Sequence, residues 1–234
     1  MKILVVGGGG REHAICWKLA QSPLVEKIYC VPGNAGIASV AECINIPVED
    51  SARLAKFAED NLISLTVVGP ELPLCGGIAD VFMAKGLKIF GPSADAARLE
   101  GSKIASKSFM LRHGIPTARA EMFEEKDKAI AYVKSNFATS GGLVIKADGL
   151  AAGKGVIVAS DVEEAITGVE SCFGGEFGDA GRKILVEETL KGEEASILAL
   201  CDGESIIPLA SSQDHKRVGV RPPVSITNSL VILR

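Results

Sequence analysis

The sequence predicts an α/β protein with an N-terminal parallel sheet wrapped by helices, followed by an α+β part with an antiparallel sheet. Two patterns support this prediction. In the first ninety residues, short β-branched runs alternate with helical stretches, which is typical of parallel strands joined by crossover helices. Beyond Pro116, strand-like runs follow one another at hairpin spacing instead. The 234 residues suffice for one large domain or two modest ones.

Four strands expected in the N-terminal part each end in a turn rich in glycine or proline. The strand-like runs are KILVVG, KIYCVPG, SLTVVGP and KIFGP, and the helix-like runs are REHAICWKLAQS, SARLAKFAEDN and GGIADVFMAKG. The turns begin at Gly7, Pro32, Gly69 and Gly91. Because the carboxyl ends of parallel strands form the crevice where open α/β sheets bind ligands, we expect these turns to line one site.

A helical connector is expected between Pro92 and about Arg119, with Ser93 as a candidate N-cap and Gly114 as a candidate stop. Beyond it, DKAIAYVKSNF and DVEEAITGVESCF are expected helices. The expected strands are LVIKA, GVIVA, ILVEE, ASILALCD and ESIIPLA. The pair Asp202–Gly203 is typical of a tight turn between the last two, so these strands indicate an antiparallel sheet.

Composition indicates a cytoplasmic enzyme or binding protein that acts on small molecules. The net charge of -4 gives no broad electrostatic reason to expect nucleic acid or an anionic membrane as partner. The first apolar run is too short for a secretory signal, and no later run is long enough for a membrane span. Without a CxxC pair, neither a zinc knuckle nor a redox motif is indicated. We expect small, buried, apolar roles for the cysteines, which are Cys16, Cys30, Cys43, Cys75, Cys172 and Cys201.

The first candidate site is the turn GGGGREH, which follows a strand and precedes a helix. Amide groups at a helix N-terminus favour an anion, and glycine lets the backbone approach it. A dinucleotide-binding GxGxxG turn is disfavoured because Glu12 occupies the third glycine position, and KIYCVPGN lacks the acidic residue that would hold a ribose. Arg11 and His13 favour a phosphorylated small molecule. A plain tight turn from Gly7 to Gly10 is the alternative.

A second glycine-rich segment, KADGLAAGKGVIV, does not fit a Walker loop. That loop requires GxxxxGK followed by Ser or Thr, between a strand and a helix. Here Gly149 and Gly153 are one residue too close, Gly155 stands where the hydroxyl is needed, and a strand-like run follows. A flexible flap between two antiparallel strands, carrying Lys146 and Lys154, can instead fold over a triphosphate. The alternative is a plain long hairpin.

Two charged segments are further candidates. In ILVEETLKGEEAS, backbone groups at the strand end could bond an adenine edge, and a carboxylate a turn later could accept both ribose hydroxyls. Taken alone, this segment fits a solvated hairpin better. In SQDHKR, the charged side chains could grip a phosphate or carboxylate, with a solvated turn as the alternative. The charged residues concerned are Glu187, Glu188, Glu193, Glu194, Asp214, His215, Lys216 and Arg217.

Taken together, these segments closely resemble the phosphoribosylamine-glycine ligases, or glycinamide ribonucleotide synthetases, of the ATP-grasp superfamily. The resemblance runs from residue 1 to about residue 219. It is carried, in the family's order, by GGGGREHA, PGNAG, VVGPELPL, FGPSADAARLEGSK, HGIPTA, VIKADGLAAGKGVIVA, FGDAG, VEETLKGEEAS and SQDHKRVG. The expected parts are a Rossmann-like pre-ATP-grasp domain at 1–103, a helical linker at 104–120, the small ATP-grasp subdomain at 121–190, the start of the ATP-grasp core at 191–219, and a tail unrelated to the family at 220–234.

The resemblance implies an enzyme of de novo purine synthesis that joins glycine to 5-phosphoribosylamine and releases ADP and phosphate. In the family, ATP phosphorylates the glycine carboxylate to a glycyl phosphate, and the sugar amine then displaces the phosphate. The implied cofactors are ATP and Mg²⁺, with Mn²⁺ as the alternative to Mg²⁺. The implied partners are these small molecules, with no nucleic acid and no membrane.

The resemblance also assigns roles by position. The triphosphate would contact Lys103 and Lys146, and the turn from Gly149 to Gly155 would be its lid. The full set of implied ATP-binding residues is Lys103, Lys146, Gly149, Gly153, Lys154, Gly155, Glu187, Glu188, Leu190 and Glu194. The phosphoribosyl substrate would contact Gly8, Gly9, Gly10, Arg11, Glu71, Asp214 and Lys216. Catalytic roles would fall to Lys146, Asp214 and Lys216.

After Gly219 the sequence departs from the family, which continues through GPNTGGMG where this chain has VRPPVSITNSLVILR. The family's metal-binding residues lie in the half that does not match, so we expect no metal ligand in this chain, which we expect to be truncated. Three alternatives are open: an active ligase completed by another polypeptide, an inactive chain with a partial ATP site, or another ATP-grasp carboxylate-amine ligase. We also expect the last apolar strands to expose an apolar edge and to cause association.

Overall fold

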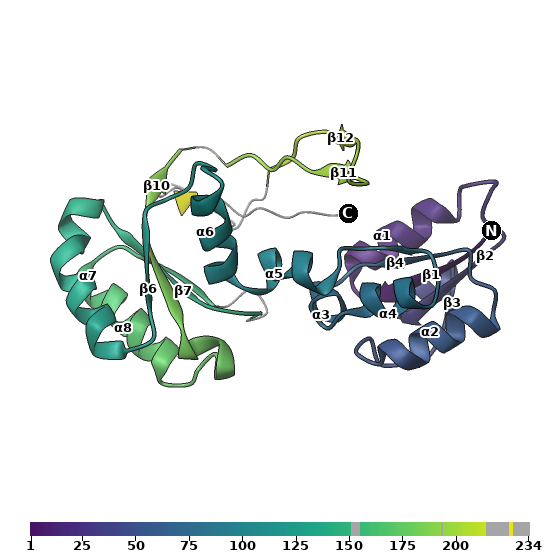
Figure 1. Cartoon of the computed structure of the whole chain (residues 1–234), viewed down its shortest axis with the longest axis horizontal. Coiled ribbons are helices and arrows are strands. Elements are labelled where there is room, and N and C mark those ends of the chain that lie inside the picture. The colour runs from purple at the N-terminus through teal and green to yellow at the C-terminus, as the bar shows by residue number, and fades with distance from the viewer. Residues whose placement is uncertain (151–154, 193, 214–224, 227–234) are drawn as a thin grey trace. The chain divides into compact units, whose positions relative to one another are not determined.

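The computed structural model describes four stretches of the chain, 1–150, 155–192, 194–213 and 225–226, the last by its backbone alone. The described residues form two compact units, whose main parts are Met1–Ala97 and Arg98–Leu200. The first unit contains a parallel sheet and the second an antiparallel sheet, and Figure 1 labels several strands of each. The predicted fold class is therefore confirmed.

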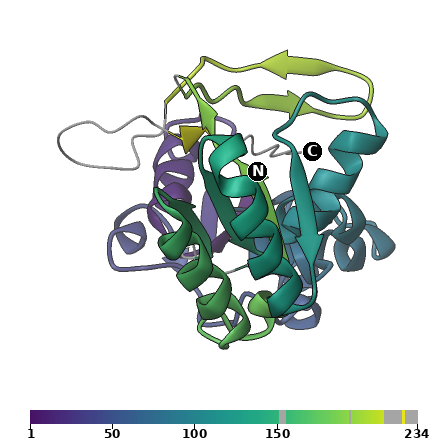
Figure 2. The same cartoon turned by 90° about the vertical axis from the view of Figure 1, so that its left-hand side faces the viewer.

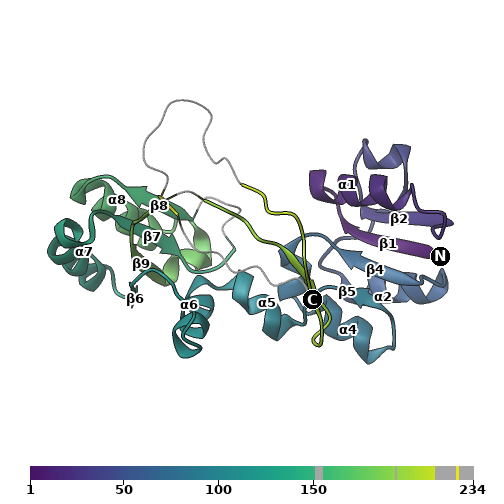
Figure 3. The same ribbon diagram turned by 90° about the horizontal axis from the view of Figure 1, so that it is seen from above.

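Five parallel strands form the sheet of the first unit, in the order β3-β2-β1-β4-β5. Their bounds are β1 Lys2–Gly7, β2 Lys27–Pro32, β3 Glu42–Cys43, β4 Leu65–Val68 and β5 Ile89–Phe90. Four of them are the strands expected from the sequence, and Figure 3 shows β2, β1 and β4 side by side. The fifth, β3, is only two residues long and carries no apolar run that would predict it.

Helices connect these strands. Their bounds are α1 Gly10–Leu19, α2 Ser51–Asp60, α3 Glu71–Cys75 and α4 Ile78–Ala84, with a 3-10 turn at Ile37–Ser39. Helices α2 and α4 lie within two of the expected helical stretches, and α1 begins one residue before the third. The short α3 follows the turn at Gly69 and had not been predicted.

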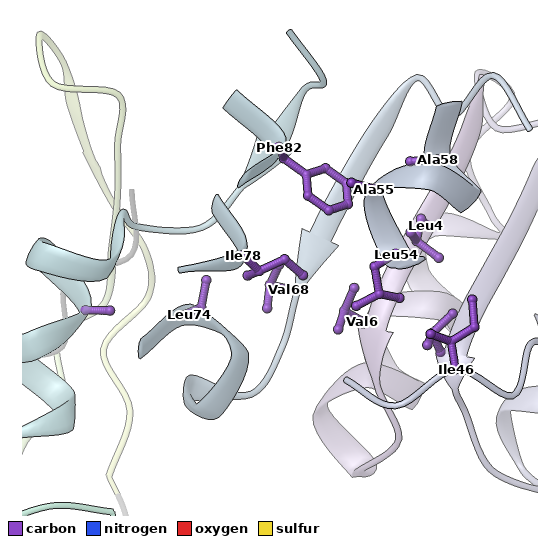
Figure 4. Close-up of a cluster of buried hydrophobic side chains, with 12 residues drawn as sticks. Leu4, Val6, Ile46, Leu54, Ala55, Ala58, Val68, Leu74, Ile78 and Phe82 are labelled. Atoms are coloured by element: carbon purple, nitrogen blue, oxygen red, sulfur yellow. The ribbon is translucent and has the colours of Figure 1, made fainter. Parts of the chain in front are cut away.

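The side chains of β1 alternate between two buried clusters. Leu4 and Val6 pack in a cluster with side chains of α2 and α4, which Figure 4 shows. Ile3 and Val5 pack in a second cluster with Cys16 of α1. A central parallel strand covered on both faces is expected to be apolar at every position. This explains the uninterrupted run ILVV, which ends at the glycine turn of the first candidate site.

The connector contains two helices, α5 (Ala94–Gly101) and α6 (Lys103–Arg112). Ser102 interrupts them, because it has extended backbone angles and its hydroxyl accepts a hydrogen bond from the α6 backbone as an N-cap. Gly114 follows the end of α6 with φ +65°, the left-handed conformation that makes glycine a common helix stop. The break at Ser102 starts a new helix next to Lys103.

The second unit contains a four-stranded antiparallel sheet in the order β6-β9-β7-β8. Its strands are β6 Ala120–Phe123, β7 Leu143–Ala147, β8 Val156–Ala159 and β9 Ile184–Glu188. Its helices are α7 Lys126–Ser140 and α8 Val162–Phe173, with a 3-10 turn at Gly178–Arg182. The predicted strands LVIKA, GVIVA and ILVEE and both predicted helices are confirmed.

The two faces of this sheet differ in chemistry. Leu143, Ile145 and Ala147 of β7 pack in one cluster with the apolar faces of α7 and α8, which lie side by side in Figure 2. Because successive side chains of a strand point to opposite faces, Lys146 lies on the other face. Glu187 of β9 shares that face, diagonally across from it in the register.

The remaining described strands are short. Strand β10 (Leu190–Lys191) pairs antiparallel with β13 (Ser225–Ile226), and β11 (Ala199–Cys201) pairs with β12 (Ile206–Pro208). The turn between β11 and β12 contains Gly203 at φ +95°, so the predicted hairpin at Asp202–Gly203 is confirmed.

The hairpin exposes a group of large apolar side chains. Its exposed residues are Ile197, Leu198, Leu200, Ile206, Ile207 and Leu209. The apolar exposure predicted for these strands is therefore confirmed, and the association it would cause stays a prediction. Separately, the described helices include none that combines the length and apolar character of a membrane span.

The prediction of buried cysteines is confirmed for three and wrong for three. Cys16, Cys30 and Cys172 are buried, whereas the remaining three, Cys43, Cys75 and Cys201, are partly exposed. The partly exposed ones lie in β3, at the end of α3 and in β11, where a side chain has neighbours on fewer sides. None of the six, all of which lie in the described stretches, forms a disulfide.

Candidate functional site

A cluster of three buried charges lies on the face of the antiparallel sheet opposite α7 and α8. It consists of Lys146 from β7, Glu187 from β9 and Lys107 from α6, whose exposed fractions are 6%, 3% and 2%. Glu187 Oε2 lies 2.5 Å from Lys146 Nζ, and Glu187 Oε1 lies 3.0 Å from Lys107 Nζ. One carboxylate therefore bridges two ammonium groups in the interior.

The cluster has an excess of positive charge. With all three groups ionised, two cations face one anion, and a buried charge is costly unless it is paired. Burial lowers the pKa of Lys146, and the nearby charge of Lys107 lowers it further, while Glu187 opposes both effects. An anionic ligand beside Lys146 would balance the excess. The cluster therefore suits a phosphate group better than a neutral or cationic ligand.

Lys103 adds a third ammonium group near this cluster. Its Nζ donates a hydrogen bond to the carbonyl oxygen of Gly149 at 3.0 Å. Burial lowers the pKa of Lys103, which also responds to the charges of Asp148 and Lys146. Two of the lysines expected to contact a triphosphate therefore lie close enough to interact.

Asp148 joins the glycine-rich loop to the start of α6. Its Oδ1 accepts hydrogen bonds from the hydroxyl of Ser102 at 2.9 Å and from the backbone N–H of Ile104 at 3.1 Å. Carboxylates are favourable at helix N-termini, where backbone N–H groups lack partners within the helix. Lys103 lies between these two contacts, so Asp148 fixes the helix end that carries it.

The glycine-rich loop connects β7 and β8, as expected for a flap between antiparallel strands. At its base, the backbone N–H of Ala147 donates to the carbonyl of Gly155 at 2.8 Å. Gly149 has φ +122°, a backbone angle that residues with a side chain rarely adopt. Gly153 and Lys154 lie outside the described residues, as do Asp214 and Lys216.

The segment expected to contact adenine and ribose continues from Glu187. The carboxylate of Glu188 accepts hydrogen bonds from the backbone N–H and the Nε of Arg119, both at 2.8 Å, and these bonds lower its pKa. Its side chain is thus bound within the protein, so a ligand contact here would fall to the backbone. Leu190 lies in β10, and Glu194 lies between β10 and β11.

In the first unit, Glu12 fills the interior of the glycine turn. Glu12 is 5% exposed, and its carboxylate accepts a hydrogen bond from the backbone N–H of Gly9 at 2.6 Å. A Cβ at Gly7 or Gly69 would collide with this side chain. The residue that breaks the GxGxxG pattern is therefore a cap for α1, where a dinucleotide fold would need a third glycine for close packing.

The turn at Gly7 contacts two of the other three predicted turns. The side-chain amide of Asn34 donates to the carbonyl of Gly8 at 2.8 Å, and Arg11 Nη1 donates to the carbonyl of Gly69 at 2.5 Å. Glu71 begins α3 two residues after Gly69. The expected substrate contacts Gly8, Gly9, Gly10, Arg11 and Glu71 thus come from adjacent turns at the carboxyl ends of β1 and β4.

The sequence reasoning missed three residues that shape these sites. Lys107 lies one helical turn after Lys103, and that spacing was its only signal. Asp148 sits directly before the glycine it helps to position, without a motif of its own. Glu12 stands three residues after the N-cap Gly9, which is the acidic position of a capping box and could have revealed its role.

Comparison with protein families gives two adjacent matches. Residues 1–100 match the family described as Phosphoribosylglycinamide synthetase, N domain, and residues 101–222 match Phosphoribosylglycinamide synthetase, ATP-grasp (A) domain. The phosphoribosylamine–glycine ligase of Brucella melitensis is 54% identical over 219 residues, which cover 94% of this chain and 51% of the relative. That of Escherichia coli K12 is 55% identical over 222 residues, with the same coverage. The chain spans about half the length of the curated relatives it matches.

Solved structures show the same arrangement. The crystal structure of phosphoribosylamine–glycine ligase from Thermotoga maritima matches with a TM-score of 0.74 and 29% identity, over 93% of this chain and 51% of that one. D-alanyl-alanine synthetase A from Vibrio cholerae matches with a TM-score of 0.65 and 18% identity, over 90% of this chain and 66% of that one. The second similarity concerns the fold alone.

Proposed function

Because this chain belongs to the phosphoribosylglycinamide synthetase family, we propose that it takes part in the ATP-dependent ligation of glycine to 5-phosphoribosylamine, giving glycinamide ribonucleotide, ADP and phosphate. The observation that carries the proposal is the buried cluster of two lysines around Glu187, with Lys103 nearby at the base of a glycine-rich loop. Such an excess of buried positive charge suits the triphosphate of ATP. The proposed setting is de novo purine synthesis in the cytoplasm.

The chemistry explains why buried lysines are needed. An oxygen of the glycine carboxylate attacks the γ-phosphorus of ATP, the bond to ADP breaks, and glycyl phosphate forms. The amine of the sugar then attacks the carbonyl carbon, loses a proton, and phosphate leaves. Both steps require phosphate charge to be neutralised in a site that excludes water. We assign Lys103 and Lys146 to the phosphates and Glu187 to the orientation of Lys146.

The other roles follow from the positions that match the family. The loop from Gly149 to Gly155 would lie over the triphosphate, with Gly153 and Lys154 at its tip. The backbone of Glu188 and Leu190 would contact adenine, and Glu194 would contact ribose. The phosphoribosyl substrate would be held by the turns of the first unit together with Asp214 and Lys216.

ATP-grasp enzymes use ATP with a divalent metal ion, and Mg²⁺ or Mn²⁺ is the ion proposed here. The ion would neutralise phosphate oxygens and hold them in a fixed geometry. In the described stretches of this chain, no group of three or more His, Cys, Asp or Glu side chains could hold an ion. The described residues therefore do not fit a metal site, and we assign no step of the reaction to the metal.

Isothermal titration of the purified chain with ATP tests the proposal. Lys146→Ala is expected to weaken ATP binding about tenfold or more, because a charge-assisted contact to phosphate is lost. Lys128→Ala is the matched control, since Lys128 of α7 is exposed and pairs with Glu125, which directly precedes that helix. An unmodified chain that fails to bind ATP, or an affinity that Lys146→Ala leaves unchanged, would contradict the proposed site.

Turnover separates the remaining alternatives. An active ligase releases ADP only when glycine and phosphoribosylamine are both present, with the Escherichia coli relative as positive control. ATP binding without ADP release would mean that this chain holds a nucleotide site without performing the ligation. ADP release with a different carboxylate and amine would indicate another ATP-grasp ligase.

A further inference from the structure

Lys107 is the member of the buried cluster to which neither the sequence motifs nor the proposed chemistry gives a role. It lies in the middle of α6, and its side chain is 3% exposed. Its Nζ donates to Thr117 Oγ1 at 2.6 Å and to the carbonyl of Ala118 at 2.8 Å, and it lies 3.0 Å from Glu187 Oε1. These partners come from the segment before β6 and from β9. The ammonium group therefore links three elements of the second unit.

The two lysines of the cluster differ in how many donors they have left. An ammonium group carries three N–H donors, and Lys107 has three acceptors around it, so it has none to offer a ligand. Among the residues that the structure describes, Lys146 Nζ has one partner, Glu187 Oε2. Two of its donors are thus open to a ligand. The donors of Lys107 are thus used within the protein, whereas those of Lys146 can bind a ligand.

We propose that Lys107 is a positioning residue for Lys146, acting through Glu187. By holding Oε1 of the carboxylate, Lys107 directs Oε2 toward Lys146 Nζ and fixes the ammonium group in the direction of the phosphates. This inference rests on the proposed function, since it assumes that Lys146 binds the triphosphate of ATP.

Lys107 also sets the charge of the site. Without it, the cluster would be a neutral pair, and both oxygens of Glu187 would be free to bind Lys146 and draw it away from a ligand. With it, the cluster keeps one positive charge in excess, which an anion can balance. The attraction is strong because these side chains are buried in a medium of low dielectric constant.

The test uses inorganic tripolyphosphate and ATP as probes, titrated into the full chain by calorimetry. Lys107→Met keeps most of the length of the side chain but removes its charge and donors, and it is expected to weaken the binding of both probes about tenfold. Lys107→Arg keeps the charge, so it is expected to restore part of the affinity. Lys128→Met is the control on an exposed lysine, with no expected change.

A double-mutant cycle shows whether Lys107 acts through Lys146. In the Lys146→Met background, Lys107→Met is expected to cause a clearly smaller loss of affinity than in the unmodified chain, because the residue it positions is absent and only its own charge is removed. A second tenfold loss in that background would mean that Lys107 acts independently and would overturn the proposal.

The pH dependence of binding is a further test, because replacing a Lys107 with a merely structural role would not shift it. Lys146 is faced by Glu187 from β9 and by Lys107 from α6, and its charge also acts on Lys103 at the start of α6. Binding needs Lys146 protonated, so it is lost as the pH rises through the pKa of Lys146. Removing the like charge of Lys107 raises that pKa. In Lys107→Met the loss of tripolyphosphate binding is therefore expected at a higher pH than in the unmodified chain, and an unshifted profile would contradict the proposal.

If Lys107→Met fails to fold, Thr117→Val provides a second test of the proposal. It removes one of the three acceptors and leaves the charge, and a loss of about twofold to fivefold in affinity is expected. If the unmodified chain binds neither probe, the proposed function and this inference both fail. If Lys146→Met abolishes binding while Lys107→Met and Thr117→Val leave it intact, the inference alone fails.

Discussion

Each unit contains one candidate phosphate site, and the two sites differ in the sign of their buried charge. The turn of the first unit offers backbone N–H groups and glycines, and the charge buried inside it is the carboxylate of Glu12. The cluster of the second unit offers lysine side chains, and its carboxylate, Glu187, is outnumbered by cations. Both carboxylates are almost fully buried, but one caps a helix and the other separates two ammonium groups. The comparison indicates that the role of a buried carboxylate is decided by the groups around it.

Replacing Glu187 should give the largest effect. Glu187→Gln leaves Lys107 and Lys146 buried without a counter-charge, so the free energy of unfolding should fall by about 3 kcal/mol or more. Urea unfolding measures it, with Glu188→Gln as the control on the neighbouring residue, whose partner Arg119 is exposed. A loss as small as that of the control would mean that the cluster does not hold the two lysines as charged groups.

The glycines around Glu12 provide the next effect. Gly69→Ala places a Cβ against the Glu12 carboxylate, which the N–H of Gly9 holds in place, so overpacking should cost about 1 to 3 kcal/mol. Gly10→Ala is the control at the start of α1, because a Cβ there meets no atom within 4 Å. If thermal unfolding shifts equally in both variants, Glu12 does not occupy the turn as described.

Glu12→Gln makes the comparison with Glu187 direct, since the same change is made to the other buried carboxylate. The amide can still accept a hydrogen bond from Gly9, and only the charge at the start of α1 is lost. The expected loss of stability is about 1 kcal/mol, well below that of Glu187→Gln. Losses of equal size would show that the surroundings of the two carboxylates matter less than their burial.

The two regions also differ in how much of them the sequence predicts. Four of the five parallel strands, their glycine turns and the hairpin strands around the loop follow from local patterns of apolar residues and glycine, and these are confirmed. Glu12 was noticed only as a departure from GxGxxG, although its spacing from Gly9 matches a helix cap. Patterns of this kind lie within a few residues of one another, which is why the sequence can reveal them.

The charged cluster depends on tertiary structure. Lys107 and Glu187 are eighty residues apart and meet only because α6 packs on one face of the sheet. Likewise, the break between α5 and α6 at Ser102 depends on Asp148, which is 46 residues further along. No local pattern encodes such contacts, so the resemblance could name Lys103 and Lys146 but gave no reason for the residues that position them.

Glu188 extends the comparison to a partly exposed carboxylate, and the smallest effect is expected there. Its pKa is lowered from 4.5 because Arg119 donates hydrogen bonds to it in the folded chain. A lowered pKa in the folded state adds stability above the unfolded value, and that stability is lost as the pH falls through the folded pKa. The difference in unfolding free energy between the unmodified chain and Glu188→Gln should therefore be small and constant above about pH 4.5 and shrink below it.

Arg119→Gln should reproduce the same trend from the other side of the pair, and urea unfolding from pH 7 to pH 3 measures both. A difference that stays constant down to pH 3 would mean that the contact is too weak to matter in solution, and only the two buried carboxylates would then respond to their surroundings.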